Sequence, residues 1–212
     1  MGCRQACQDC VVAIRAVIFD IGGVLETDPP TGWLERWAER LGLGAPDVVS
    51  RLEPISRAGN IGAISLPQAQ EQIAAVLGLS EAQLGQFMED LWAEYLGTLN
   101  TELTGYFAAL RPRYRTGILS NSFVGARERE RDAYGFESLC DVVVYSHEEG
   151  MEKPDPRFYH IVTARLGVQP HEAVFLDDHE ECVQGARDVG MTAVLFGRNE
   201  QAIADLEAHL RG

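Results

Sequence analysis

Six polar residues in this sequence lie where an apolar run ends or where a helix is about to begin. They are Asp20, Ser120, Asn121, Lys153, Asp177 and Asp178. Asp20 stands between the apolar run Ala16–Phe19 and a glycine turn, so a buried strand would place its carboxylate at the rim of a sheet. The carboxyl ends of parallel strands meet at one edge, and we therefore expect these side chains to converge there.

Three carboxylates at one sheet edge repel one another, and a hard divalent cation would remove that repulsion. Mg²⁺ prefers oxygen ligands and often combines one or two carboxylates with the phosphate oxygens of a substrate. Asp20 and Asp178, with Asp177 beside them, suit this ion. Asp20 could then attack a phosphorus atom and form an aspartyl-phosphate. Lys153 and Ser120 would hold the oxygens of the transferred group.

The rest of the chain predicts the elements that position these residues. Apolar runs predict strands near 14–20, 115–119, 141–145, 173–176 and 192–196. Amphipathic spacing predicts helices near 101–111, 123–134, 156–166, 180–189 and 199–210. This alternation indicates an α/β fold that is doubly wound, with a mostly parallel sheet and helices on both faces.

The segment 28–98 has a helical pattern instead. One amphipathic stretch begins near Trp33 and ends at Gly42. Two further helix starts carry capping-box signals, in which Ser65 or Ser80 is followed three residues later by glutamine. We therefore predict a helical insertion after the first strand.

Composition limits the classes of partner. The chain has 212 residues, of which 46% are apolar and 24% charged, with a net charge of −14. An anionic surface disfavours binding to nucleic acid or to acidic membranes. No apolar run approaches the roughly 18 residues of a membrane span. We expect a cytoplasmic protein. Residues 1–13 are expected to be a disordered leader, because the C-x-x-C pair Cys7 and Cys10 lacks the second pair of a zinc site.

Four segments in this order resemble the motifs of the haloacid dehalogenase-like (HAD) hydrolase superfamily. They are Phe19–Leu25, Leu119–Asn121, Lys153–Pro156 and Phe175–Asp178. The resemblance extends from about Ile14 to the end of the chain, and the subgroup it points to is small-cap phosphatases whose first motif is Asp-x-Gly. It implies a Rossmann-like core of residues 14–27 and 99–212 and a helical cap of residues 28–98.

The resemblance also implies the ligands of the site. Mg²⁺ would be bound by Asp20, the carbonyl of Gly22 and Asp178, with Asp177 close by. Gly23 and Asn121 are expected to bind the substrate, which would be a small phosphorylated metabolite such as a sugar phosphate. The substrate itself and the oligomeric state stay open.

One position departs from the family pattern. Typical phosphatases of this superfamily carry a second aspartate two residues after the nucleophile, where this chain has Gly22. General acid–base help is worth roughly 10²–10⁴-fold. Three consequences are open: the substrate has a good leaving group, another group such as Glu26, His147 or a cap residue substitutes, or turnover is lost. Two alternatives to a phosphatase stay open. One is a metal-independent 2-haloacid dehalogenase, which also uses an aspartate nucleophile. The other is a non-catalytic phosphate-binding protein, which Gly22 supports.

Overall fold

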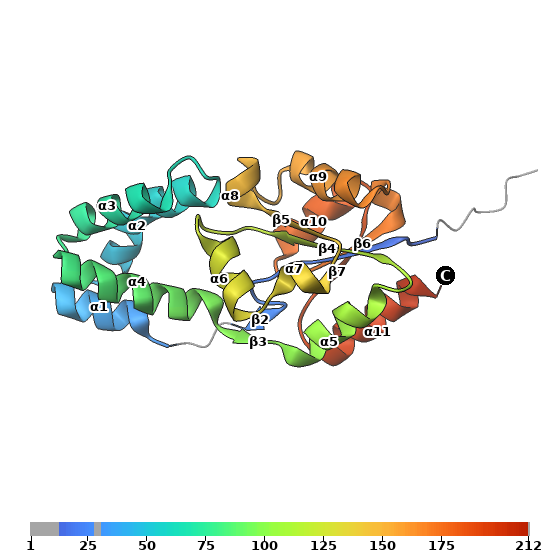
Figure 1. Ribbon diagram of the computed structural model, residues 1–212, viewed down its shortest axis with the longest axis horizontal. Coiled ribbons are helices and arrows are strands. Elements are labelled where there is room, and N and C mark those ends of the chain that lie inside the picture. The colour runs from blue at the N-terminus through green and yellow to red at the C-terminus, as the bar shows by residue number, and fades with distance from the viewer. Residues whose placement is uncertain (1–12, 28–30, 212) are drawn as a thin grey trace, which may run out of the picture.

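A five-stranded parallel sheet forms the centre of the larger half of the molecule in the computed structural model, which describes residues 13–27 and 31–211 (Figure 1). Its order is β5-β4-β1-β6-β7. The strands are β1 (Ala16–Phe19), β4 (Arg115–Ser120), β5 (Val142–Tyr145), β6 (Ala173–Asp177) and β7 (Thr192–Leu195). All neighbouring pairs are parallel, which confirms the predicted α/β class. The predicted leader, apart from residue 13, lies outside the described residues.

Helices cover both faces of this sheet. One face carries α5 (Thr101–Leu110) and α11 (Asn199–Leu210), and the other carries α9 (Pro156–Leu166) and α10 (Glu180–Asp188). Successive side chains of a strand point to opposite faces. Val17 and Phe19 therefore join the first hydrophobic cluster, and Ala16 and Ile18 join the second. This double burial explains why β1 is a continuous apolar run that ends only at Asp20.

Four helices between the first strand and α5 form a separate unit, at the left of Figure 1. They are α1 (Trp33–Leu41), α2 (Ala45–Asn60), α3 (Leu66–Leu77) and α4 (Glu81–Leu96). Their buried side chains form a hydrophobic cluster of their own. The hydroxyl oxygens of Ser65 and Ser80 accept hydrogen bonds from the backbone N–H groups of Gln68 and Gln83, which confirms both predicted capping boxes. The division of the chain into core and cap domains stays a prediction.

Helix α2 lies within the predicted helical segment 28–98 but contains two prolines. Pro46 lies in the first turn, where no backbone N–H is needed. Pro54 lies inside the helix and removes one hydrogen bond. The helix persists around it because Val48 and Ile55 are buried in the cluster of the helical unit.

A short antiparallel pair connects the helical unit to the sheet. It consists of β2 (Glu26–Thr27) and β3 (Thr98–Leu99), which the apolar pattern of the sequence did not indicate. The Asn100 side chain stabilises this connection, because its Nδ2 donates a hydrogen bond of 2.9 Å to the carbonyl of Val24, in the turn after β1. The remaining elements are α6 (Ala126–Ala133), α7 (Phe136–Leu139), α8 (Ser146–Glu149) and the short 3₁₀ helix Pro170–Glu172. None of the helices in the described ranges is long and apolar enough to cross a lipid bilayer.

Candidate active site

Asp20 lies immediately after β1, at the carboxyl edge of the sheet and between β4 and β6. Its backbone N–H donates to the Leu176 carbonyl at 2.9 Å, so the sheet ladder fixes its position. Its side-chain Oδ1 accepts the Ile21 N–H at 2.8 Å. The carbonyl of Ile21 in turn accepts the N–H groups of residues 24, 25 and 26, and this tight turn leads the chain away from the strand.

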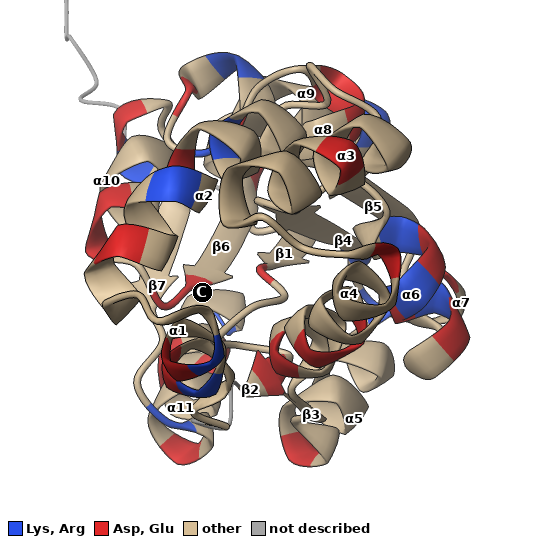
Figure 2. Cartoon of the chain, turned by 90° about the vertical axis from the view of Figure 1, so that its left-hand side faces the viewer, with Lys and Arg blue, Asp and Glu red and all other residues tan. Residues whose placement is uncertain are grey.

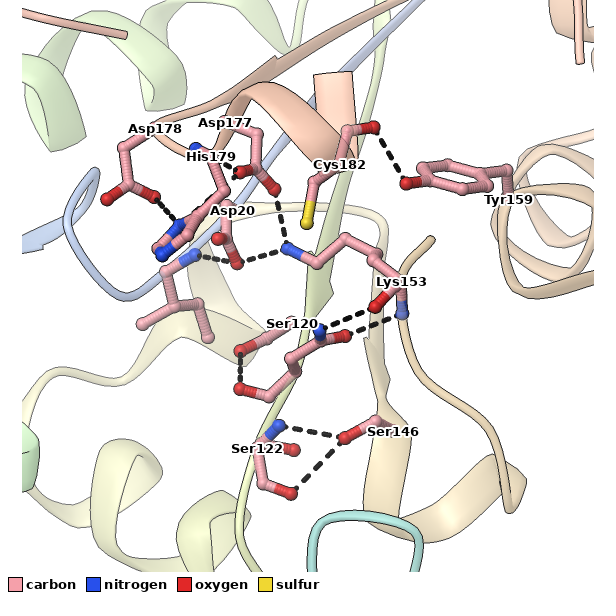
Figure 3. Close-up of polar contacts among 12 residues, drawn as sticks. Asp20, Ser120, Ser122, Ser146, Lys153, Tyr159, Asp177, Asp178, His179 and Cys182 are labelled. Atoms are coloured by element: carbon pink, nitrogen blue, oxygen red, sulfur yellow. Dashed lines mark hydrogen bonds and ion pairs between the residues drawn. The ribbon is translucent and has the colours of Figure 1, made fainter. Parts of the chain in front are cut away.

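Lys153 connects two of the predicted carboxylates. Its Nζ lies 2.8 Å from Asp20 Oδ1 and 2.7 Å from Asp177 Oδ2, and all three side chains are buried (Figure 3). Asn121 holds the lysine backbone with both ends of its amide, because Nδ2 donates to the Lys153 carbonyl at 3.0 Å and Oδ1 accepts the Lys153 N–H at 2.8 Å. Asn121 therefore positions Lys153, and its role in substrate binding stays a prediction.

The cluster of Asp20, Asp177 and Lys153 carries more negative than positive charge when both carboxylates are ionised, so a second cation would stabilise it. Burial raises the pKa of Asp20 to about 7; the Lys153 ammonium opposes this shift, and Asp177 adds to it. Burial alone would lower the pKa of Lys153, but Asp20 and Asp177 outweigh it and the net shift is upward. One ammonium group between two buried carboxylates does not neutralise both. A further positive charge near Asp20 would favour its ionised form, which is the form a nucleophile needs.

The two consecutive aspartates of the fourth motif occupy different environments. Asp177 is fully buried and uses Oδ2 for Lys153 and Oδ1 for the His179 N–H at 2.8 Å. The Asp178 side chain is 27% exposed, and its Oδ1 lies 2.8 Å from His179 Nδ1. Asp178 lines a pocket of about 260 Å³ together with Asp20, Gly22 and Gly23. Three of the four predicted metal residues, Asp20, Gly22 and Asp178, thus line one pocket. The fourth, Asp177, does not line this pocket and contacts Lys153 instead.

The residues present fit a magnesium ion. Asp20, Asp178 and the Gly22 carbonyl offer only oxygen atoms, which this hard cation prefers. Gly23 adopts a positive φ of 70°, and a Cβ built on it would lie 2.2 Å from Asp178 Oδ2. The Asp178 carboxylate therefore packs directly against the backbone of the glycine turn. Among the described residues, His179 also brings a ring nitrogen within 4.8 Å of the Asp177 and Asp178 oxygens. His179 lies at the start of α10 with an exposed side chain.

The glycine turn provides a matched test of this packing. Gly23→Ala is expected to displace the Asp178 carboxylate and to lower Mg²⁺ affinity about 10-fold or more, since altered positioning of metal ligands has effects of that order. Gly22→Ala is the control, because a Cβ at Gly22 would meet no atom within 4 Å and the backbone carbonyl is kept. Mg²⁺ titration by calorimetry measures both. Equal affinities in the two variants would contradict the assigned role of Asp178.

Ser120 ends β4 and faces a second pocket beside the first. This pocket, of about 220 Å³, shares Gly22 and Asn121 with the pocket around Asp20. Its lining residues are Ile21, Gly22, Glu26, Glu94, Tyr95, Ser120, Asn121 and Glu130. We call it the acidic pocket. Of its carboxylates, the sequence had singled out only Glu26. Glu94 comes from α4 and Glu130 from α6, two helices that lie next to each other and both carry acidic positions (Figure 2).

Comparison with known proteins establishes the family. A model of haloacid dehalogenase-like hydrolases matches residues 14–190, so this chain belongs to that family and the resemblance of its motifs is confirmed. Acyl-CoA dehydrogenase family member 10 of Mus musculus is 29% identical over 211 residues, covering 92% of this chain and 19% of that protein. D-ribitol-5-phosphate phosphatase of Bacteroides thetaiotaomicron is 21% identical over 188 residues, covering 84% of this chain and 89% of that protein.

The solved structures support the fold. A HAD family enzyme of Bacteroides thetaiotaomicron, crystallised with magnesium and inorganic phosphate, superposes with a TM-score of 0.74 over 87% of this chain and 95% of that chain. Its sequence identity is 22%, so this likeness supports the fold alone. The chain spans between 19% and 43% of the length of the first three curated relatives that it matches.

Proposed function

We propose that this chain is a Mg²⁺-dependent phosphatase of a small phosphorylated metabolite, such as a sugar phosphate, and that it acts through an aspartyl-phosphate on Asp20. The observation that carries the proposal is the position of Asp20. Its carboxylate is fixed by Lys153 and the Ile21 N–H in the same pocket as Asp178. Relatives named as phosphatases of ribitol 5-phosphate and glyceraldehyde 3-phosphate agree with this substrate class.

The side chains suggest a division of roles. Asp20 Oδ1 takes both fixed bonds, and Oδ2 has no hydrogen-bond donor among the described residues, which leaves Oδ2 to attack phosphorus. The P–O bond to the leaving group breaks as the Asp20–phosphorus bond forms, and water later hydrolyses the acyl phosphate. Bound Mg²⁺, held by Asp20, the Gly22 carbonyl and Asp178, would supply charge stabilisation for the phosphoryl oxygens. Lys153 adds positive charge, and Ser120 offers a hydroxyl to a phosphoryl oxygen.

A screen of phosphorylated metabolites with and without Mg²⁺ tests this function. We expect phosphate release that requires Mg²⁺ and stops on addition of a chelator. Chloride release from 2-haloacids without metal, in the absence of any phosphate release, would favour the dehalogenase alternative. Binding of phosphate esters without any turnover would favour the non-catalytic alternative, whose support is Gly22.

The missing carboxylate at Gly22 predicts a dependence on the leaving group. Without a general acid at that position, phosphates of acidic alcohols should be favoured, because their leaving groups depart without protonation. Acyl and anomeric phosphates are expected to exceed alkyl phosphates by roughly 10²-fold or more in kcat/KM. A series of phosphates graded by the pKa of the leaving group measures this slope. Equal values across the series would show that another residue supplies the proton.

A further inference from the structure

The acidic pocket has a composition that the transfer of a phosphoryl group does not require. Three carboxylates line it, from Glu26, Glu94 and Glu130, and none of its lining residues is Lys, Arg or His. A phosphate group would be repelled by such walls. The pocket that holds Asp20, Lys153 and Asp178 suits the phosphate instead. The acidic pocket is therefore suited to a different part of the substrate.

Glu130 is the most informative of these residues. Its side chain is fully buried, and Oε2 accepts the Tyr145 hydroxyl at 2.6 Å. Oε1 is buried and forms no hydrogen bond of ordinary geometry within the described ranges, although the Tyr95 side chain interacts with this carboxylate. A buried polar atom without a partner destabilises the fold unless a ligand supplies the missing bond. Burial raises the pKa of Glu130 to about 7, because the surrounding hydrogen bonds and charges do not replace the water that its ionised form has lost.

Among the described residues, no Lys, Arg or His forms an ion pair with Glu130, although Arg127 is near enough to lower its pKa. Arg127, on the same helix, is committed to Glu137 and Glu148, with its Nε 2.5 Å from the latter. Glu94 accepts a hydrogen bond from the Thr31 hydroxyl, which is its only partner among the described residues. This partner carries no charge, as is true of the Tyr145 hydroxyl that bonds to Glu130. The acidic pocket thus combines negative charge with acceptor atoms, and none of the residues that line it is cationic.

The position of the acidic pocket defines which part of the substrate enters it. Gly22 and Asn121 line both this pocket and the pocket around Asp20. A group bonded to phosphorus at Asp20 would extend past Gly22 into the acidic pocket. The part of the substrate that meets Glu130 is therefore the leaving group.

Resting on the phosphatase function proposed above, we propose that the leaving group carries an ammonium group, which Glu130 and Glu94 bind beside the Tyr95 ring. An ammonium group has three donors and no acceptor, so it suits walls made of acceptors. It also supplies the positive charge that a hydroxyl group lacks, and an aromatic face adds favourable cation–π attraction. The substrate class is a phosphorylated amino sugar or amino alcohol, of which the anomeric phosphates of amino sugars also have the better leaving group that Gly22 favours.

Matched substrate pairs test this proposal. Glucosamine 1-phosphate is compared with glucose 1-phosphate, and 2-aminoethyl phosphate with 2-hydroxyethyl phosphate, so that each pair differs only in the ammonium group. We expect kcat/KM to favour the amine by about tenfold or more in at least one pair, because a hydrogen bond to a charged group stabilises a complex by an amount that corresponds to about this factor. If both pairs are turned over without preference, the proposal is overturned while the phosphatase function stands.

Two variants localise the effect. Glu130→Gln keeps an acceptor for the Tyr145 hydroxyl and removes the charge, and it should reduce the amine preference several-fold. Glu128→Gln, exposed on the same helix, should leave the preference unchanged. The ratio of the two substrates is measured on one protein sample, so partial unfolding cancels. An unchanged ratio in Glu130→Gln would overturn the assignment.

Binding measurements keep the proposal testable without turnover. If no phosphate ester is hydrolysed, the phosphatase function fails, and calorimetry of the same pairs with the Asp20→Asn variant still reports on the acidic pocket. Tighter binding of the amines would then support the inference, and equal binding would overturn it. Two Mg²⁺ ions bound per chain, with the second lost in Glu130→Gln, would assign the pocket to a metal and would also overturn it.

Discussion

Asp20→Asn is expected to lower Mg²⁺-dependent phosphate release at least about 10³-fold, because an amide oxygen does not replace a carboxylate nucleophile. The fold should survive. The amide oxygen can still accept the Ile21 N–H and the Lys153 ammonium, and the change removes a buried charge that lies near Asp177. Phosphate release from acetyl phosphate measures the activity, and thermal unfolding measures the fold.

A chemical readout separates loss of the nucleophile from loss of binding. Acid quenching during turnover should trap a covalent phosphoenzyme in the unmodified protein and none in Asp20→Asn. Asp188→Asn is the control, because Asp188 is exposed at the end of α10 and its described partner is Gln184. It makes the same chemical change far from the pocket and should keep full activity. If Asp20→Asn retained more than about a tenth of the rate, another residue would have to be the nucleophile.

The strand ends were predictable from the sequence because burial on both faces leaves a simple signal. The strands β1 and β6 are unbroken apolar runs that each stop at an aspartate, and this polar residue marks the carboxyl edge of the sheet. Parallel pairing then brings Asp20 close to Ser120 and Asp177 whatever the details of the loops. The capping boxes of Ser65 and Ser80 were predictable because they depend on residues three positions apart.

The acidic pocket was not predictable from the sequence, because it forms only when segments far apart in the chain pack together. Glu130 belongs to the sequence Ala126–Ala133, ARERERDA, whose charged composition indicates a helix facing solvent. It is buried only because Tyr145, at the end of β5, and the helix α4 pack over it. Likewise, α2 depends on the burial of Val48 and Ile55, which outweighs the two prolines in its sequence.

Lys153→Met is expected to destabilise the protein by about 3–5 kcal/mol, since removal of one partner leaves buried charges uncompensated. Lys153 is the only lysine of the sequence, and its ammonium is the group that both Asp20 and Asp177 contact. Urea unfolding at constant pH measures the free energy of unfolding. Arg157→Met is the control, because it removes an exposed ion pair with Asp155 and should change stability little.

The pH dependence and a second substitution identify the cause. In Lys153→Met the pKa of Asp20 should rise further above its unfolded value, because the ammonium group that favours its ionised form is removed. A carboxyl group with a raised folded pKa loses stability as pH rises, so the deficit should be larger at pH 8 than at pH 5. Adding Asp177→Asn removes one of the two uncompensated charges and should recover part of the loss, which a double-mutant cycle quantifies. A deficit that is independent of pH and unrelieved by Asp177→Asn would mean that Lys153 acts through packing, and the electrostatic account of this site would be wrong.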